Sequence, residues 1–180
     1  FLPGMAWGSA DWNYGGSAAS FSTVYFMKYF NPALTWSESW DSGQDFYLIR
    51  YSEVLLSLAE AYVESYQNLD KAVSLIDDVR TRAGMPTVEN VEGTGLSQAQ
   101  LREIVRHERR VELAFEGLRL FDLYRWHALK DAVDRVNDEA STYKFAYEYR
   151  NYKGEQEYVW PIPQTELDSN PKLTQNELWK

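Results

Sequence analysis

The stretch from Arg102 to Trp126, REIVRHERRVELAFEGLRLFDLYRW, places charged side chains where a helix that packs against a core should be apolar. At about 100° per residue, its apolar side chains gather on one side of a helix. Glu108 and Glu112 fall in the middle of that side. The apolar arc consists of Leu101, Ile104, Val105, Val111, Phe115 and Leu118.

The next segment repeats this arrangement, with Asp122 and Arg125 at the centre of a second apolar stripe. Gly117 lies between the two stripes and weakens the helix, so we expect a kink or break there. The second stripe consists of Leu118, Phe121, Leu129, Ala132, Val133 and Val136.

A carboxylate in an apolar interface costs several kcal/mol unless it is paired and hydrogen-bonded. The nearest cations for these acids are Arg119 and Arg125, and Arg109, Arg80, Arg82 and Arg50 are further candidates. Arginine stays charged and keeps a neighbouring acid ionised, which favours a structural role over acid–base catalysis. We predict a buried network that ties helices together, formed by Glu108, Glu112, Arg119, Asp122 and Arg125. Glu112→Ala or Arg125→Ala is then expected to cost on the order of 3 to 5 kcal/mol.

Motifs that would indicate catalysis or a cofactor are missing from the sequence. His107-Glu108 begins like a zinc protease HExxH motif, but position 111 is Val. There is no P-loop, no dinucleotide-binding glycine motif and no nucleophile elbow, and the chain has two His and no Cys. Glu38, Asp41 and Asp45 fit no calcium-loop spacing. We therefore predict no enzyme activity, no metal site and no cofactor.

The hydrophobic periodicity predicts a mostly α fold with a single domain over residues 1–180. A helix is expected from Asp45, its cap, to Tyr66, with an apolar face that includes Leu48, Tyr51, Leu55, Leu58 and Ala59 and a second edge through Ser52, Leu56 and Val63. A second helix should run over 69–83, with Ala72, Val73, Ile76 and Val79 inward. Small residues on both helices make residues 46–84 a tetratricopeptide-like helix pair.

After a loop over residues 85–96, Ser97 and Gln100 form a capping box that starts the central charged helices, residues 97–137. Residues 143–160 alternate apolar and polar side chains around a turn, which indicates a short β-hairpin or a pair of extended segments. An extended tail to residue 180 follows, and its apolar side chains should hold it on the helical body: Ile162, Leu167, Leu173 and Trp179.

Residues 1–45 are rich in glycine, serine, asparagine and aromatic residues and lack a sustained period, which predicts a long aromatic-rich loop region. Aromatic faces beside polar groups suit sugars, because rings stack on the apolar C–H face while polar groups bind hydroxyls. The alternative is that these rings pack on a protein core. The ligand-binding candidates are Trp7, Trp12, Tyr14, Trp36 and Trp40.

The formal net charge of −9 and the pI near 4.8 make nucleic acid a poor partner, since an acidic surface repels phosphates. No run of about eighteen apolar residues is present, so we expect no membrane span in this chain. Its 180 residues suffice for one domain with a sizeable core.

The string ERRVELAFEGLRLFDLYRW resembles the signature of the SusD/RagB family of outer-membrane nutrient-capture proteins of Bacteroidetes. Two further blocks resemble the family in the expected order: YLIRYSEVLLSLAEAY upstream and VWPIPQTELDSNPKLTQN at the end. The matching positions of the signature are Glu108, Arg109, Glu112, Leu113, Glu116, Gly117, Arg119, Asp122, Leu123, Arg125 and Trp126.

The resemblance implies non-catalytic capture of an oligosaccharide at the cell surface and its delivery to a SusC-like TonB-dependent transporter. It also implies that this chain is the C-terminal portion of a longer protein of the outer membrane, attached through an N-terminal lipid anchor absent from this chain. Three alternatives stay open: oligopeptide capture by the same kind of complex, a helical-repeat interaction scaffold, and a glycoside hydrolase.

Overall fold

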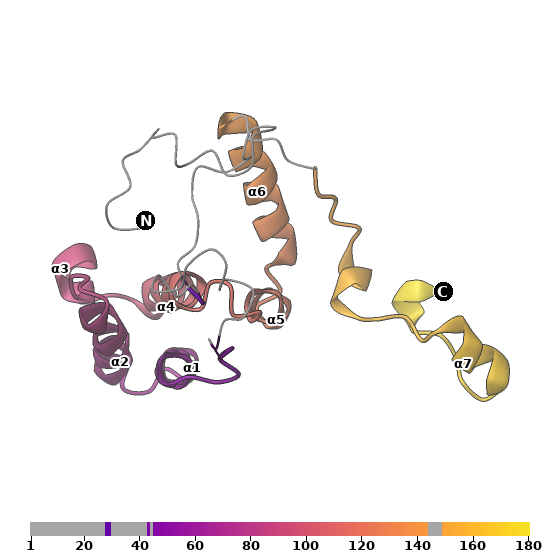
Figure 1. The fold of residues 1–180 in the computed structure, drawn as a ribbon, viewed down its shortest axis with the longest axis horizontal. Helices are drawn as coiled ribbons and strands as arrows, with labels where there is room; N and C mark the ends of the chain where they lie inside the picture. Colours follow the sequence, from indigo (N-terminus) through magenta and orange to yellow (C-terminus); the bar gives the residue numbers. More distant parts are fainter. Residues whose placement is uncertain (1–27, 30–42, 44, 144–148) are drawn as a thin grey trace. The chain divides into compact units, whose positions relative to one another are not determined.

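The computed structural model describes residues 28–29, 43, 45–143 and 149–180. All regular structure in these residues is helical, which confirms the mostly α fold (Figure 1). The chain divides into two compact units, and the boundary in the described residues falls between Arg119 and Leu120. The single domain expected for residues 1–180 stays a prediction.

The first helix, α1, spans Tyr51–Glu64. Asp45 was predicted as its cap, but the residue at the cap position is Arg50, whose backbone is extended and whose carbonyl accepts hydrogen bonds from the N–H groups of Glu53 and Val54. The Arg50 side chain caps nothing in this helix. The prediction of Asp45 as the cap was wrong because the helical spacing of apolar residues continues before Tyr51, through residues 45–50, which are not helical.

The buried side of α1 combines the predicted second edge with Leu55 and Ala59 of the predicted main face. Leu56 and Val63 are fully buried, whereas Tyr51 and Leu58 from the predicted main face are exposed. The small residue Ala59 is fully buried, as expected for a close helix crossing. The prediction placed the centre of the apolar face wrongly because large apolar residues occur on both sides of α1.

The second helix, α2, spans Leu69–Arg82 and agrees with its prediction to within one residue. Asn68 adopts a left-handed conformation and its side-chain oxygen accepts a hydrogen bond from the backbone N–H of Lys71 at 3.2 Å. Gly84, at φ +71°, follows the last residues of the helix. The side chains of Ala72, Ile76 and Val79 are buried, as predicted.

A short helix, α3, spans Val88–Glu92 inside the segment that was predicted as loop. The Thr87 side chain caps it by accepting from the Asn90 N–H, and the Val88 N–H donates to Asp77 of α2 at 2.7 Å. Val88 is almost fully buried. This single turn was missed because one buried residue gives no periodic pattern.

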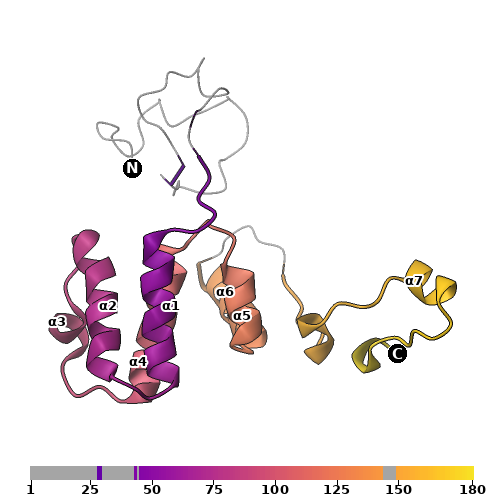
Figure 2. The same ribbon diagram turned by 90° about the horizontal axis from the view of Figure 1, so that it is seen from below.

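The helix α4 spans Gln98–Glu112, and the capping box of Ser97 and Gln100 is present as predicted. At its start, the Gln98 side chain donates to the backbone carbonyl of Val63, at the end of α1, at 2.8 Å. At its end, Glu112 contacts Arg50, at the beginning of α1. The two helices are therefore antiparallel, and Figure 2 shows α1, α2 and α4 side by side.

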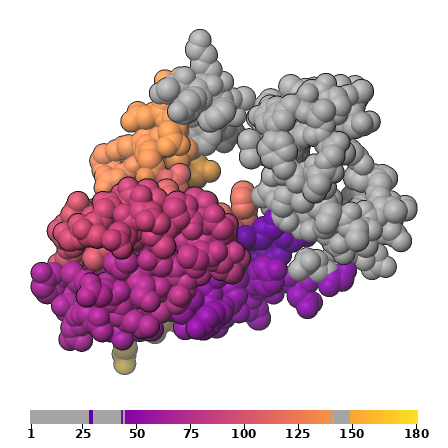
Figure 3. Space-filling view, turned by 90° about the vertical axis from the view of Figure 1, so that its left-hand side faces the viewer, coloured from indigo at the N-terminus to yellow at the C-terminus, as the bar shows by residue number. Residues whose placement is uncertain are grey.

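One apolar core lies between these helices, with α3 at its edge. Figure 3 faces the side formed by α2 and α3, whose atoms make one continuous surface. At about 25 cal/mol per Å² of buried apolar surface, such packing is the main source of stability for helices of this length. The core consists of Leu55, Leu56, Ala59, Val63, Ala72, Leu75, Ile76, Val79, Val88, Leu101, Ile104 and Val105.

The predicted break around Gly117 is present: α4 ends at Glu112, Phe115 has φ +66° and Gly117 has φ +80°. Val111 and Phe115 are exposed rather than buried as predicted. Val111 lies about 240° around the helix from Val105, away from the core side, and Phe115 follows the end of the helix. The true apolar arc is therefore narrower than the predicted one.

In the second unit, α5 (Arg119–Arg125) and α6 (Leu129–Tyr143) replace the predicted continuation of one helix to Asn137. His127, at φ +53°, lies in the turn between them. Phe121 was predicted to face inward and is exposed, whereas Leu123 is buried. The helical spacing of apolar residues continues through this turn, so the sequence pattern did not reveal that the helix breaks there.

Asn137 was predicted to end this helix, but it lies buried within α6. Its side chain donates to the carbonyl of Arg150 at 2.8 Å and accepts from the Arg150 N–H at 3.1 Å. Both the nitrogen and the oxygen of this buried amide therefore have a hydrogen-bond partner. It fixes the beginning of the tail beside α6.

The predicted hairpin is wrong for its second arm: Glu155–Tyr158 forms the 3-10 helix η3, after Gly154 at φ +111°. The first arm falls largely on residues 144–148, outside the described part. Two short helices follow, α7 (Gln164–Ser169) and η4 (Glu177–Trp179). Polar and apolar alternation over a few residues does not distinguish a strand from a 3-10 turn.

The tail is held mainly by contacts within itself. Ile162 exchanges two backbone hydrogen bonds with the side chain of Gln175, at 3.0 Å each. The Trp179 indole donates to the carbonyl of Val159 at 2.9 Å. Ile162 and Leu167 are half-buried, whereas Leu173 is 40% and Trp179 38% exposed. Packing of these side chains on the helical body stays a prediction.

Tyr158 connects η3 to the turn between α5 and α6. Its hydroxyl accepts a hydrogen bond from the Leu129 N–H at 3.0 Å. Its ring lies against His127, with 4.0 Å between ring centroids, and edge-on to Tyr124 and Tyr152. Desolvation and the hydrogen bond to Glu155 raise the pKa of Tyr152 to about 12.

Candidate functional site

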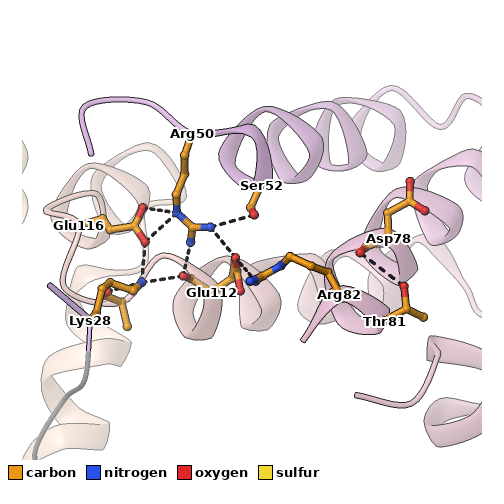
Figure 4. A network of polar contacts seen from close by, with 9 residues as sticks. Lys28, Arg50, Ser52, Asp78, Thr81, Arg82, Glu112 and Glu116 are labelled. Atoms are coloured by element: carbon orange, nitrogen blue, oxygen red, sulfur yellow. Dashed lines mark hydrogen bonds and ion pairs between the residues drawn. The ribbon is translucent and has the colours of Figure 1, made fainter. Parts of the chain in front are cut away.

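The ligand-binding candidates of the sequence lie outside the described residues, namely Trp7, Trp12, Tyr14, Trp36 and Trp40. The first unit holds Glu112 and Glu116 of the signature, whereas Asp122 and Arg125 belong to the second unit. Glu112 and Glu116 lie with Lys28, Arg50 and Arg82 where α1 begins and α2 and α4 end (Figure 4). We call these five residues the charged cluster.

Glu116 is at the centre of the cluster, and its side chain is only 3% exposed. Arg50 Nε donates to both carboxylate oxygens, at 2.9 and 2.8 Å. Lys28 Nζ approaches the same carboxylate at 2.5 Å. We call this Lys28–Glu116–Arg50 arrangement the Glu116 bridge; it neutralises one buried carboxylate with two cations.

Lys28 also binds the end of α4. Its Nζ donates to the backbone carbonyls of Glu112 at 2.9 Å and Ala114 at 2.8 Å. These carbonyls have no partner within the helix, and a cation at a helix C-terminus is favoured by the helix dipole. Lys28 therefore donates to three acceptors, of which it shares the Glu116 carboxylate and the Glu112 carbonyl with Arg50.

Glu112 completes the cluster from the last turn of α4. Its carboxylate accepts from Arg50 Nη1 and Arg82 Nη2, each at 2.6 Å. Arg50 also donates to Ser52 Oγ at 2.8 Å and to the carbonyl of Glu112 at 2.5 Å. One guanidinium thus joins α1, α4 and the segment that follows α4.

Further along the bundle, two more ion pairs cross between helices. Arg80 of α2 donates to Glu108 of α4 at 2.8 Å. Arg109, which is buried, donates to Ser57 at 3.0 Å and approaches Glu60 of α1 at 3.7 Å. These charged pairs lie within the interface, so each inward carboxylate has a cationic partner.

The cations that bind Glu108 and Glu112 are Arg80, Arg50 and Arg82, which the sequence offered only as further candidates. The expected partners Arg119 and Arg125 were chosen for nearness in sequence. Arg125 instead pairs with Asp122 inside α5, at 2.8 Å. The correction has a physical reason, because helix packing brings together residues far apart in the chain, whereas close neighbours in sequence share a helix.

Sequence reasoning left Glu116 and Lys28 out of the network. The signal for Glu116 was available, since it follows Glu112 by one helical turn and belongs to the signature motif. Lys28 gave no such signal, because it lies in the aromatic-rich region far from the charged helices.

The electrostatics of the cluster fit a structural junction. Burial by itself would raise the pKa of Glu116, but hydrogen bonds from Arg50 and Lys28 outweigh it and lower that pKa. Desolvation opposes the charge of Arg50, yet its bonds to Glu116 and Glu112 raise the Arg50 pKa further above its ordinary value. Glu116 is therefore a poor proton donor at neutral pH.

The described residues contain no cluster of His, Cys, Asp or Glu arranged to hold a metal ion. None of their helices combines the length and apolar character needed to cross a lipid bilayer.

Comparison with known proteins identifies a family. The SusD family model matches residues 6–179. Two similar proteins of Formosa agariphila are SusD-like protein P2, 31% identical over 156 residues, and SusD-like protein P25, 32% identical over 153 residues. These alignments cover 84% and 85% of this chain but only 29% and 28% of the relatives.

Solved structures agree with this assignment. A SusD homolog from Bacteroides thetaiotaomicron is 32% identical with a TM-score of 0.62, over 75% of this chain and 27% of that one. A SusD-like protein from Bacteroides fragilis is 26% identical with a TM-score of 0.56, over 73% and 25%. The chain thus spans less than a third of the length of these relatives. Because the family model matches nearly its whole sequence, the chain belongs to the SusD family.

Proposed function

We propose that this chain is part of a non-catalytic cell-surface protein that binds oligosaccharides and delivers them to a TonB-dependent outer-membrane transporter. Membership of the SusD family supports this proposal. The transporter would be SusC-like, and membrane attachment would come through a lipid anchor.

The proposal that the protein is not an enzyme is supported by the pairing of the signature glutamates with arginines. Glu108, Glu112 and Glu116 all bind guanidinium groups within the helical unit. A carboxylate whose oxygens are occupied by arginine is neither a proton donor nor a free nucleophile. These acids of the signature motif therefore have a structural role, and we assign ligand binding to the aromatic-rich residues 1–45.

The test is a glycan array followed by calorimetry on the whole protein, with released sugar reducing ends measured in the same samples. We expect saturable binding without turnover. Trp12→Ala and Trp36→Ala should weaken binding and leave the melting temperature unchanged. Trp160→Ala is a matched control, because Trp160 is 81% exposed in the tail and its loss should alter neither quantity.

Each alternative predicts a different result in this experiment. Release of reducing ends that is lost on mutation of one acid would show a glycoside hydrolase. Binding of oligopeptides with no response to any sugar would show peptide capture. Unchanged ligand binding in both tryptophan variants, with partner binding intact, would leave a helical interaction scaffold.

A further inference from the structure

The side of α1 that faces away from the core is uncharged over the first three turns of the helix. Of the acids in this helix, Glu53 is half-buried, Glu60 is buried and Glu64 pairs with Arg102. A helix face that meets water is normally polar or charged, so this face has the composition of an interior one. Its exposed residues are Tyr51, Val54, Ser57, Leu58 and Ala61.

The outward sides of the two neighbouring helices differ from that of α1. On α2 the exposed residues include Lys71, Asp78 and Arg82, and on α4 they include Glu103 and Arg110. All three helices share one apolar core, and Figure 1 looks nearly along α1, with α2 and α4 beside it. Of these three helices, α1 alone is apolar on its outward side as well, which is typical of a helix that protein covers on both sides.

Three large side chains form a ridge on this outward face, namely Tyr51, Val54 and Leu58, and all three are exposed. We call these three residues the α1 ridge. Their spacing of three and then four residues aligns them along the helix. A row of this kind fits the groove between side chains of a second helix, which is how helices pack on one another. The shape of the face therefore favours a helix as the element that covers it.

The composition of this face also indicates what kind of contact it makes. Interfaces that form and dissociate resemble the rest of a protein surface and include polar and charged residues, whereas permanent interfaces are more apolar. The α1 ridge and the other exposed residues over the same turns are uncharged. A permanent contact, such as one within a single polypeptide, fits this composition.

The length of the relatives provides a source for such a helix. More than two thirds of each of the two SusD-like relatives lies outside the stretch aligned with this chain, since the alignments cover 29% and 28% of them. We propose that a helix from the rest of the whole protein packs on the α1 ridge and makes α1 an inner helix. This inference rests on the part of the proposed function that makes this chain a portion of a longer protein, and it does not depend on the ligand.

Thiol labelling of the purified whole protein tests the proposal, because residues 1–180 contain no cysteine. Val54→Cys and Leu58→Cys place a thiol on the ridge, and either variant suffices if the other folds poorly. Asp78→Cys is the matched control, because it places a thiol on the exposed and charged side of α2. The labelling rate of each variant is divided by its rate in urea, which removes differences in intrinsic reactivity. The wild type gives the background.

Both ridge thiols should react about tenfold more slowly than the thiol at position 78, because a covered thiol reacts only when its contact opens. This protection should not change with protein concentration, as expected for a contact within one polypeptide. A photoreactive phenylalanine analogue in place of Val54 should cross-link to a peptide of the same molecule from outside residues 1–180.

Three results would each overturn the proposal. Labelling of both ridge variants as fast as Asp78→Cys shows that the ridge is open in the purified protein. Protection that is lost on dilution shows that a second copy covers the ridge. Cross-links confined to residues 1–180 show that this chain covers its own ridge. Sugar binding enters none of these measurements, so the glycan array can fail or succeed independently of them.

Discussion

Arg50 and Glu116 are 66 positions apart in the sequence, yet Arg50 Nε donates to both oxygens of the Glu116 carboxylate, at 2.9 and 2.8 Å. Arg50 immediately precedes α1, and Glu116 lies in the segment after α4. This pair fixes where the chain enters and leaves the three packed helices. The signature of the family therefore acts at a junction between chain segments, and several measurable consequences follow from its geometry.

Removal of the Glu116 side chain should be among the most damaging changes in the charged cluster. Glu116→Ala leaves Lys28 and part of Arg50 without a counter-charge, so we expect a loss of about 3 kcal/mol in the free energy of unfolding. Urea unfolding monitored by circular dichroism measures this loss. The control Glu64→Ala removes an exposed pair and should cost less than about 1 kcal/mol.

Arg125→Ala should be mild, contrary to the expectation from the sequence. Arg125 is 44% exposed and pairs within one helix with Asp122, which is buried but has a further polar or charged contact, so a loss near 1 kcal/mol is expected. The same urea experiment checks it. A loss of 3 kcal/mol or more, the range of about 3–5 for broken buried pairs, would show that Arg125 is buried in the whole protein.

The stability contributed by Glu116 should depend on pH. Its pKa is lowered in the folded state, where the bonds from Arg50 and Lys28 outweigh desolvation. The unfolded chain then binds this proton more tightly, so the stabilisation is present above the ordinary carboxyl pKa and is lost as pH falls through the folded-state pKa.

The measurement is the stability difference between the wild type and Glu116→Gln, followed from about pH 7 to about pH 3. We expect this difference to shrink toward the acid end. A difference that stays constant, or that grows with acid, would contradict a lowered pKa for Glu116.

Ala59 of α1 is fully buried in the core that α1 forms with α2 and α4, where a small side chain permits close helix packing. Ala59→Leu adds methylene groups to a packed core and should destabilise the protein by about 1–3 kcal/mol. Ala61 is exposed on the same helix, so Ala61→Leu controls for helix propensity and should have little effect. Scanning calorimetry of the two variants tests this, and equal melting temperatures would mean that the crossing is loosely packed.

Tyr158 should stabilise the second unit in two separable ways. Tyr158→Phe removes the acceptor for the Leu129 N–H and should cost about 1 kcal/mol. Tyr158→Ala also removes the ring that packs with His127, Tyr124 and Tyr152, and the larger loss should speed amide exchange in η3 and in the beginning of α6. Identical exchange in the two variants would show that the ring contributes nothing beyond its hydroxyl.

The sequence by itself determined the features that depend on near neighbours. The capping box of Ser97 and Gln100, the inward face of α2 and the break near Gly117 follow from spacing and backbone preference within a few residues. The family was also available from the order of its motifs, which needs no coordinates. Each of these features depends on contacts within a few residues, so spacing along the chain was enough to predict it.

Only the tertiary structure decided which charges meet. Nearness in sequence selected Arg119 and Arg125 as partners for Glu108 and Glu112, whereas helix packing brought Arg80, Arg50 and Arg82 to them. The same packing exposed Tyr51 and Phe115, buried Glu116 and placed Lys28 on the end of α4. A carboxylate on the apolar face of a predicted helix indicates that a cation must lie nearby. Many lysines and arginines along the chain could fill that role, and only the packing of distant segments determines which one lies within bonding distance.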